Sequence, residues 1–295
     1  MKNHLLLALF VGWTISGLFP VMCESAETES PAPTMTKGSG DTGKECCSSD
    51  DMHSLAKAAQ NPVAKMISVP IQNNFNFGVG PTDGVQYQTV WEPVYPVGLS
   101  KDWNLINRAI IPVPMYQPRV SASQGSTWGI GDIQYEAFIS PAKPGKVIWA
   151  VGPYLSFPSA SSDVLGTGKW SAGPSVAALT MPGHWVFGAL VSQLWSFAGD
   201  DDRSNVSFGS LQYFINYNIP NGKGWYLSSS PTMTANWKAA GSQQFTVPVG
   251  GGVGKIFKIG KQAMNAKIQA FGYPVKPDGG PDWGLQFQLT FLFPE

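Results

Sequence analysis

The sequence of 295 residues has few charged side chains and no net charge. Asp, Glu, Lys and Arg make up 13% of it, about half of the share in an average soluble domain. Lys and Arg together number 19, as do Asp and Glu, and no basic block interrupts the chain. We therefore expect no nucleic-acid partner, because such a partner requires a positively charged face.

Long hydrophobic runs are absent beyond the N-terminal residues. No segment after Phe19 approaches the roughly 20 apolar residues that a membrane-spanning helix needs. The mean hydropathy is near neutral, at -0.05, although the chain has 11 Trp and 16 Phe. This combination argues against a helical membrane protein and favours strands in which apolar and polar residues alternate.

Residues for catalysis and metal binding are also scarce. The chain has three histidines and three cysteines. His184 and Ser192 could form part of a hydrolase site on a barrel wall, but we do not predict that the protein is an enzyme. Cys46 and Cys47 could bind a metal together with His53 and Asp50 or Asp51, but the spacing lacks the second ligand pair of zinc motifs, which favours incidental thiols. We predict no catalytic residue, no metal and no cofactor.

The N-terminal region differs in composition from the rest of the chain. Residues 1–23 contain Lys2 and an apolar run, which is typical of a secretory signal peptide. Residues 24–53 are rich in Ser, Thr, Glu, Gly and Pro, which predicts a disordered linker. Residues 54–65 predict a short helix or plug-like segment at the mouth of, or inside, a barrel formed by residues 66–295.

The last strand shows the alternation most clearly. Residues 282–293 read DWGLQFQLTFLF, and six large apolar residues from Trp283 to Phe293 fall on one face. The other face is polar except at Leu292. Such a strand suits a bilayer, with lipid on one face and a polar interior on the other. Since an unpaired strand cannot cross lipid, it requires a closed barrel.

The same alternation recurs about twelve times. The predicted strands cover approximately 66–79, 85–99, 103–115, 128–140, 147–157, 168–181, 185–198, 205–219, 225–238, 243–259, 262–275 and 282–293. The connections alternate between longer and shorter, with both termini on the short-loop side. The sequence thus predicts an all-β fold, an antiparallel up-and-down transmembrane β-barrel of about twelve strands, in which the last strand pairs with residues 67–79.

Charged residues on the inward face are candidates for lining the lumen. They are Glu92, Arg108, Asp132, Glu136, Lys238 and Lys267. One hypothesis is a polar lining that conducts small solutes through a narrow or plugged pore. The alternative is a network of ion pairs that fills a structural barrel, including a static pair between Glu92 and Arg108.

Tryptophans near the strand ends are candidates for two aromatic belts at the membrane surfaces. The candidates are Trp91, Trp103, Trp225, Trp237 and Trp283. A carbohydrate-binding row of aromatic rings is the alternative.

Several stretches resemble one known family. They include AQNPVAKMISVPIQNNFNFGVGP (59–81), DWNLINRAIIPV (102–113), GIGDIQYEAFISPAKPG (129–145), ALTMPGHWVFGALVSQLWSFAGD (178–200) and TVPVGGGVGKIFKIGKQ (246–262). The family is the outer-membrane β-barrel family of the phenol meta-pathway, often labelled "transporter" or "neuromedin U".

This resemblance implies a barrel in the outer membrane of a Gram-negative-type envelope, in contact with lipid, that acts as a passive channel. The solute would be small, and the family name hints at a hydrophobic or aromatic compound. The closing strand resembles the C-terminal signal of the barrel-assembly machinery, except that it ends in Phe293-Pro294-Glu295. Two alternatives remain open: a non-conducting structural or binding barrel, and a soluble secreted β-protein.

Overall fold

The structure is a computed structural model that describes residues 49–119, 121 and 125–294. These residues belong to a single compact unit. The predicted signal peptide, the predicted linker as far as residue 48, and Cys46 and Cys47 lie outside the described residues. Within the described part, no helix has both the length and the apolar character needed to cross a membrane.

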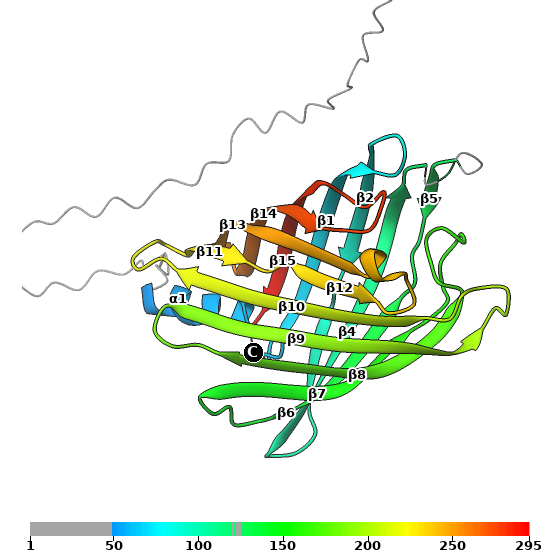
Figure 1. The fold of residues 1–295 in the computed structure, drawn as a ribbon. Helices are drawn as coiled ribbons and strands as arrows, with labels where there is room; N and C mark the ends of the chain where they lie inside the picture. Colours follow the sequence, from blue (N-terminus) through cyan, green and yellow to red (C-terminus); the bar gives the residue numbers. More distant parts are fainter. Residues whose placement is uncertain (1–48, 120, 122–124, 295) are drawn as a thin grey trace, which may run out of the picture. The chain divides into compact units, whose positions relative to one another are not determined.

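The described chain forms one closed antiparallel sheet (Figure 1). Consecutive strands pair, apart from three pairs of segments that lie end to end, and β15 pairs with β1 over Ile67↔Phe293 to Phe77↔Trp283, which closes the barrel. The strands are β1 (Ile67–Val79), β2 (Gly84–Trp91), β3 (Val94–Gly98), β4 (Trp103–Gln117), β5 (Thr127–Gly129), β6 (Gln134–Pro141), β7 (Val147–Ser156), β8 (Lys169–Thr180), β9 (Trp185–Gly199), β10 (Ser207–Asn218), β11 (Trp225–Ser229), β12 (Thr232–Asn236), β13 (Phe245–Ile259), β14 (Gln262–Val275) and β15 (Trp283–Phe293).

Three pairs of these fifteen segments lie end to end, so the barrel has twelve strands, which confirms the predicted fold. β2 and β3 both pair with β1 and β4, β5 and β6 both pair with β4, and β11 and β12 both pair with β10 and β13. Pro93 stands between β2 and β3, and Pro231 stands between β11 and β12. Proline has no backbone N–H to donate to a neighbouring strand, which accounts for the two interruptions.

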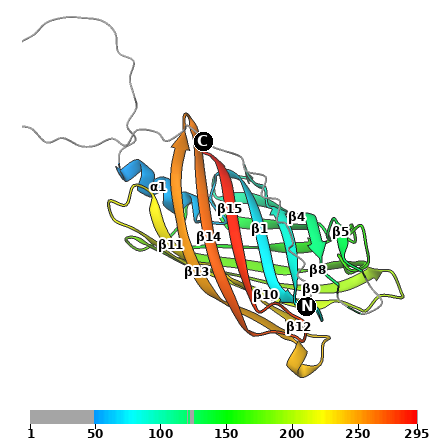
Figure 2. The ribbon, with the colours of Figure 1, turned by 90° about the horizontal axis from the view of Figure 1, so that it is seen from above.

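The two ends of the barrel differ. The connections 80–83, 157–168, 200–206, 237–244 and 276–282, and the described residues 118–119 and 125–126, lie at one end, which we call the loop end. The other end, which we call the helix end, has the shorter connections 99–102, 142–146, 181–184, 219–224 and 260–261. The helix α1 (Ser49–Ala59) and the end of β15 lie there, as Figure 2 shows. The predicted alternation of loop lengths is therefore present.

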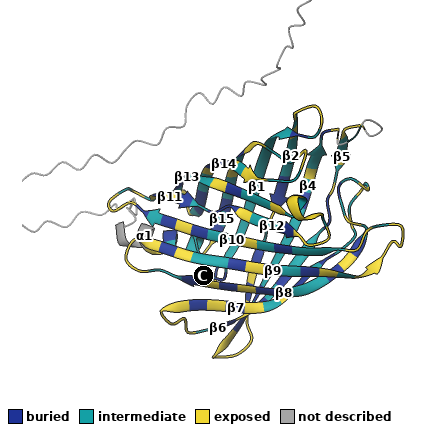
Figure 3. Ribbon diagram, in the orientation of Figure 1, coloured by how far each residue is buried: buried dark blue, intermediate teal, exposed yellow. Residues whose placement is uncertain are grey.

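Inward and outward faces alternate along the strands (Figure 3). On β9, for example, Val191 is 50% exposed, whereas the next residue, Ser192, is 3% exposed. The outward face carries exposed tryptophans, phenylalanines and aliphatic residues from every part of the barrel wall. The protein thus turns its large apolar side chains outward and many of its polar ones inward, the reverse of a soluble barrel.

Helix α1 begins and ends earlier than the predicted segment 54–65, and it begins within the range predicted as linker. It ends before Pro62 because the residue that precedes a proline is disfavoured in helical conformation. The Asn61 side chain instead accepts a hydrogen bond from the backbone N–H of Val63 at 3.0 Å, which forms a turn. The helix forms because its Ala56 face packs on the barrel interior, a contact that residue composition alone does not show.

Residues 54–66, which we call the plug segment, lie between two apolar clusters inside the helix end of the barrel. Val63 packs in a cluster with inward residues of β3, β4, β6, β7, β8, β9 and β10, among them Ile106, Phe138 and Leu179. Ala56 and Met66 pack in a second cluster with Tyr226, Ile256, Ala263 and Leu292. Leu292, which interrupts the polar face of the last strand, is 1% exposed and therefore belongs to the surface that holds this segment.

Candidate functional site

Two cavities lie inside the barrel. The outer cavity, about 650 Å³, opens at the loop end and is lined by β-strand residues such as Gln134, Ser171 and Phe208 and by residues 202–206. The inner cavity, about 140 Å³, lies against the plug segment, whose residues 58–62, Ala64 and Met66 supply part of its wall. Strand residues of the inner cavity include Gln72, Gln212 and Thr290.

Strand β6 shows the order of these regions along the lumen. Gln134 lines the outer cavity, Glu136 is buried two residues further on, and Phe138 belongs to the apolar cluster around Val63. From the loop end to the helix end, the interior therefore passes from a wide polar cavity through a charged layer to an apolar layer around the plug segment.

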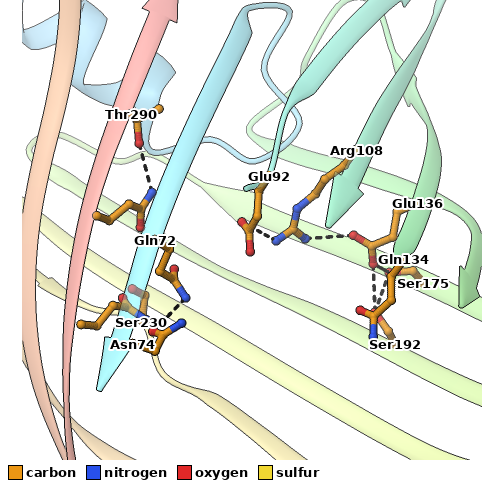
Figure 4. Close-up of polar contacts among 12 residues, drawn as sticks. Gln72, Asn74, Glu92, Arg108, Gln134, Glu136, Ser175, Ser192, Ser230 and Thr290 are labelled. Atoms are coloured by element: carbon orange, nitrogen blue, oxygen red, sulfur yellow. Dashed lines mark hydrogen bonds and ion pairs between the residues drawn. The ribbon is translucent and has the colours of Figure 1, made fainter. Parts of the chain in front are cut away.

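The charged layer is an ion cluster of three residues (Figure 4). Arg108 lies opposite Glu136 in the β4–β6 register, and its Nη1 is 2.9 Å from Glu136 Oε2. Its Nη2 is 3.0 Å from Glu92 Oε2. The Arg108 and Glu92 side chains are 14% and 19% exposed, and that of Glu136 only 2%. One guanidinium thus holds two carboxylates in a site of low exposure, where removal of either partner is costly.

Two serines from more distant strands complete the cluster. The hydroxyl groups of Ser175 on β8 and Ser192 on β9 donate to Glu136 Oε1 at 2.9 and 3.3 Å. They reach β6 across β7 because Ser175 lies opposite Gly152, which has no side chain. A Cβ at Gly152 would collide with the Ala137 carbonyl, so glycine is required at this close approach.

Lys267 on β14 is a second cation in the lumen. Its Nζ donates to the hydroxyl oxygen of Ser230 at 3.0 Å. Within the described residues no carboxylate lies within ion-pair distance of it, and it lines the inner cavity together with Glu92 and Arg108. Glu92 and Ser230 stand at the two strand interruptions, so both irregular points of the wall face this cavity.

The remaining two lumen candidates lie at the outer cavity. Asp132 is 8% exposed and accepts hydrogen bonds from the backbone N–H groups of Ala160 and Thr167 at 3.2 and 2.6 Å. It therefore anchors the 157–168 connection as well as lining the cavity. Lys238 is exposed in the turn after β12. Four of the six lumen candidates thus lie at the inner cavity or in the charged layer, whereas Asp132 and Lys238 lie at the outer cavity.

The five candidate belt tryptophans all point outward and are 42–47% exposed. Trp103 and Trp225 begin strands at the helix end, whereas Trp237 and Trp283 lie at the loop end. Trp91 lies elsewhere, opposite Ile71 near the middle of the barrel wall, because β3 continues the strand that β2 begins. At the loop end Trp283 stacks on Phe77, with ring centroids 4.0 Å apart.

The structure does not bring together the two residues of the hydrolase alternative. Ser192 lies in the middle of β9, and its hydroxyl group bonds to Glu136 and to Ser175, with 2.7 Å between the serine oxygens. His184 lies in the turn at the helix end. The part of the chain that the structure describes contains no group of three or more His, Cys, Asp or Glu residues placed to hold a metal ion.

Sequence patterns did not identify two residues of the site. Ser175 and Ser192 bind Glu136, but neither was among the predicted lining residues. Gln269, an inward residue of β14, is 1% exposed and joins Ser230 to Gln286 on β15. Alternation along a strand identifies such residues as inward. Which inward side chains contact one another depends on the register between strands, and that register is set by pairings between distant parts of the chain.

Comparison with known proteins agrees with this geometry. The model of the family "MetA-pathway of phenol degradation" matches residues 82–271, which is more than half of the chain. No curated protein matches. Among solved structures, an outer membrane channel from Pseudomonas putida F1 is similar, with a TM-score of 0.58 and 15% identity, over 77% of this chain and 94% of that one.

Two further solved structures resemble the chain more weakly. The NanC porin has a TM-score of 0.48 and 12% identity, over 77% of this chain and 100% of that one. A FadL homologue from Pseudomonas aeruginosa has a TM-score of 0.40 and 10% identity, over 80% of this chain and 92% of that one. The match to the family model, together with the twelve-stranded barrel, shows that the chain belongs to the "MetA-pathway of phenol degradation" family.

Proposed function

We propose that the protein is an outer-membrane β-barrel and a passive channel for a small polar solute. The observation that carries this proposal is the pair of cavities within one lumen, about 650 and 140 Å³, with charged, amide and hydroxyl side chains on their walls. A barrel with a purely structural interior would be filled by side chains instead. The solved channel from Pseudomonas putida F1, which has the same fold, supports the same proposal.

The outward surface supports a location in the outer membrane. Exposed apolar residues cover it, including Phe197 at 68% and Ile259 at 64%, and water would disfavour so large an apolar surface. Tryptophans stand at both ends of the wall, where the two lipid–water interfaces would lie. The helix end, with its short turns and the end of β15, would face the periplasm, and β15 would present the signal for the barrel-assembly machinery.

The plug segment narrows the helix end of the proposed channel. Its apolar side chains are buried at 2–6% exposure in Ala56, Val63 and Met66. Polar contacts add to this packing, since the side chains of Gln60 and Asn218 exchange hydrogen bonds at 2.9 and 3.2 Å. A channel of this form would pass small solutes slowly and exclude large ones.

The lining favours a polar solute over the hydrophobic or aromatic compound that the family name suggests. Arg108, Glu92 and Lys267 face the inner cavity together with amides and hydroxyl groups. A hydrophobic solute would have to strip water from these groups without replacing their hydrogen bonds, which costs free energy for each group.

Osmotic swelling of liposomes that contain the folded full-length protein tests solute passage. We expect swelling in arabinose to exceed that of protein-free liposomes, while the larger sugar raffinose is excluded. Swelling equal to that of protein-free liposomes in arabinose, with the barrel folded, would favour the non-conducting binding barrel instead.

Cell fractionation tests the location. We expect the protein in the outer-membrane fraction, with a mobility on denaturing gels that changes on heating, because closed barrels resist detergent until heated. Phe287→Asp should lower the amount of folded protein, since it places a charge on the outward face near the middle of β15. Phe287→Tyr is the matched control. Recovery of the unaltered protein from the soluble periplasmic fraction would instead support the soluble secreted β-protein.

A further inference from the structure

We propose that the inner cavity is a binding site for a small uncharged solute with several hydroxyl groups. The cavity lies between the charged layer and the plug segment, and its wall includes residues of β1, β10, β11, β14 and β15. This inference rests on the proposed function only for how the solute reaches the site. Its evidence is a hydroxyl group without a partner, unpaired amides, and a balance of charge.

Ser228 on β11 supplies the first observation. It is 5% exposed, lines the inner cavity, and its hydroxyl oxygen is buried with no hydrogen-bond partner among the described residues. A buried hydroxyl group without a partner costs free energy, so such groups are uncommon. Because this oxygen is closed off from the cavity in the observed side-chain position, it meets a solute hydroxyl once the Ser228 side chain rotates toward the cavity.

Two amides of the cavity wall are also available. Gln212 and Asn216 are inward residues of β10 that line the cavity, and their side chains form no hydrogen bond to another described residue. Each amide can both donate and accept a hydrogen bond. A solute hydroxyl group also does both, whereas a hydrocarbon does neither.

The charges around the cavity balance. Arg108 and Lys267 contribute two positive charges, and Glu92 and Glu136 contribute two negative charges. A bound ion would leave the site with a net charge at low exposure, which is unfavourable and favours a neutral solute. A carboxylate could still pair with Lys267, so an anion of similar size is the competitor to test against glycerol.

The volume limits the size of the solute. The cavity measures about 140 Å³. An apolar protein cavity of about 150 Å³ accommodates benzene, so the solute here should be about as large as benzene. Glycerol is small enough for this volume and carries one hydroxyl group on each of its three carbons, which makes it a suitable probe.

Saturation-transfer NMR with the full-length barrel in detergent micelles tests the site. The three probes are glycerol, propionate and benzene, which are of similar size but are respectively hydroxylated, anionic and apolar. We expect saturable binding of glycerol and weaker binding of the other two. Ser228→Ala should weaken glycerol binding about fivefold, the effect of losing one hydrogen bond.

Ser171→Ala is the matched control. Ser171 is also buried without a hydrogen-bond partner among the described residues, but it lines the outer cavity, so its removal should leave glycerol binding unchanged. Neither substitution should impair folding, because each removes a buried group that has no partner. The mobility shift on heating checks this.

Three results would overturn the proposal: no saturable glycerol binding, tighter binding of propionate or benzene than of glycerol, or equal glycerol binding in Ser228→Ala and the unaltered protein. None of these three results depends on whether the barrel conducts solutes. Glycerol binding without solute flux in liposomes would leave the site standing and make the protein a binding barrel.

Discussion

Deletion of residues 49–65 is expected to raise the single-channel conductance of the barrel about threefold or more, since a twelve-stranded barrel leaves space in its interior when nothing fills it. The deleted residues include Ala56 and Val63, which occupy the helix end between the two apolar clusters. The barrel strands begin at Ile67 and remain intact. Recording in planar lipid bilayers measures the change.

Two substitutions of Val63 test the same role of the plug segment as the deletion does. Val63→Asp places a charge among Ile106, Phe138 and Leu179, where nothing compensates it, so it should loosen the plug segment and raise the conductance. Val63→Ile keeps the apolar contact and should leave the conductance unchanged. If the deletion variant and the full-length protein conduct equally, the plug segment does not narrow the channel.

Arg108→Ala is expected to lower the free energy of unfolding by about 3–5 kcal/mol, the typical cost of removing one partner of a buried ion pair. The substitution leaves the carboxylates of Glu92 and Glu136 in the lumen without their cation. Urea unfolding of the barrel in lipid vesicles, followed by tryptophan fluorescence, measures the effect.

Two control variants separate the ion cluster from general effects of losing an arginine. The triple variant Arg108→Ala, Glu92→Gln and Glu136→Gln should recover much of the lost stability, because no uncompensated charge remains. Arg203→Ala should cost less than Arg108→Ala, since its partner Asp163 is 92% exposed and its other contacts are hydrogen bonds to the backbone carbonyl groups of residues 163, 166 and 167. If Arg108→Ala costs no more than Arg203→Ala, the cluster contributes nothing to stability.

The strands could be predicted because period-two alternation is a local property of the sequence. The twelve strands and their order agree with the prediction, and β15 pairs with β1 as expected. Alternation also placed Glu92, Arg108, Glu136 and Lys267 inside the barrel. It placed Lys238 inside as well, but β12 ends at Asn236, so Lys238 is exposed in the following turn. The alternation of inward and outward side chains applies only within a strand.

The plug segment and the cavities could not be predicted in the same way. The helix ends before Pro62 and begins at Ser49, and its packing partners come from strands far along the chain. One signal was present in the sequence: Leu292 interrupts the polar face of β15, and it packs in the cluster with Ala56. Inward apolar residues near one end of several strands indicate that another segment fills that end.

The most direct test of the proposed channel is single-channel recording of the full-length protein beside the variant that lacks residues 49–65. We expect discrete current steps for both, with smaller steps for the full-length protein, because the plug segment narrows the helix end. Flat traces for both proteins, with folded barrels shown in the same membranes, would contradict the proposed channel.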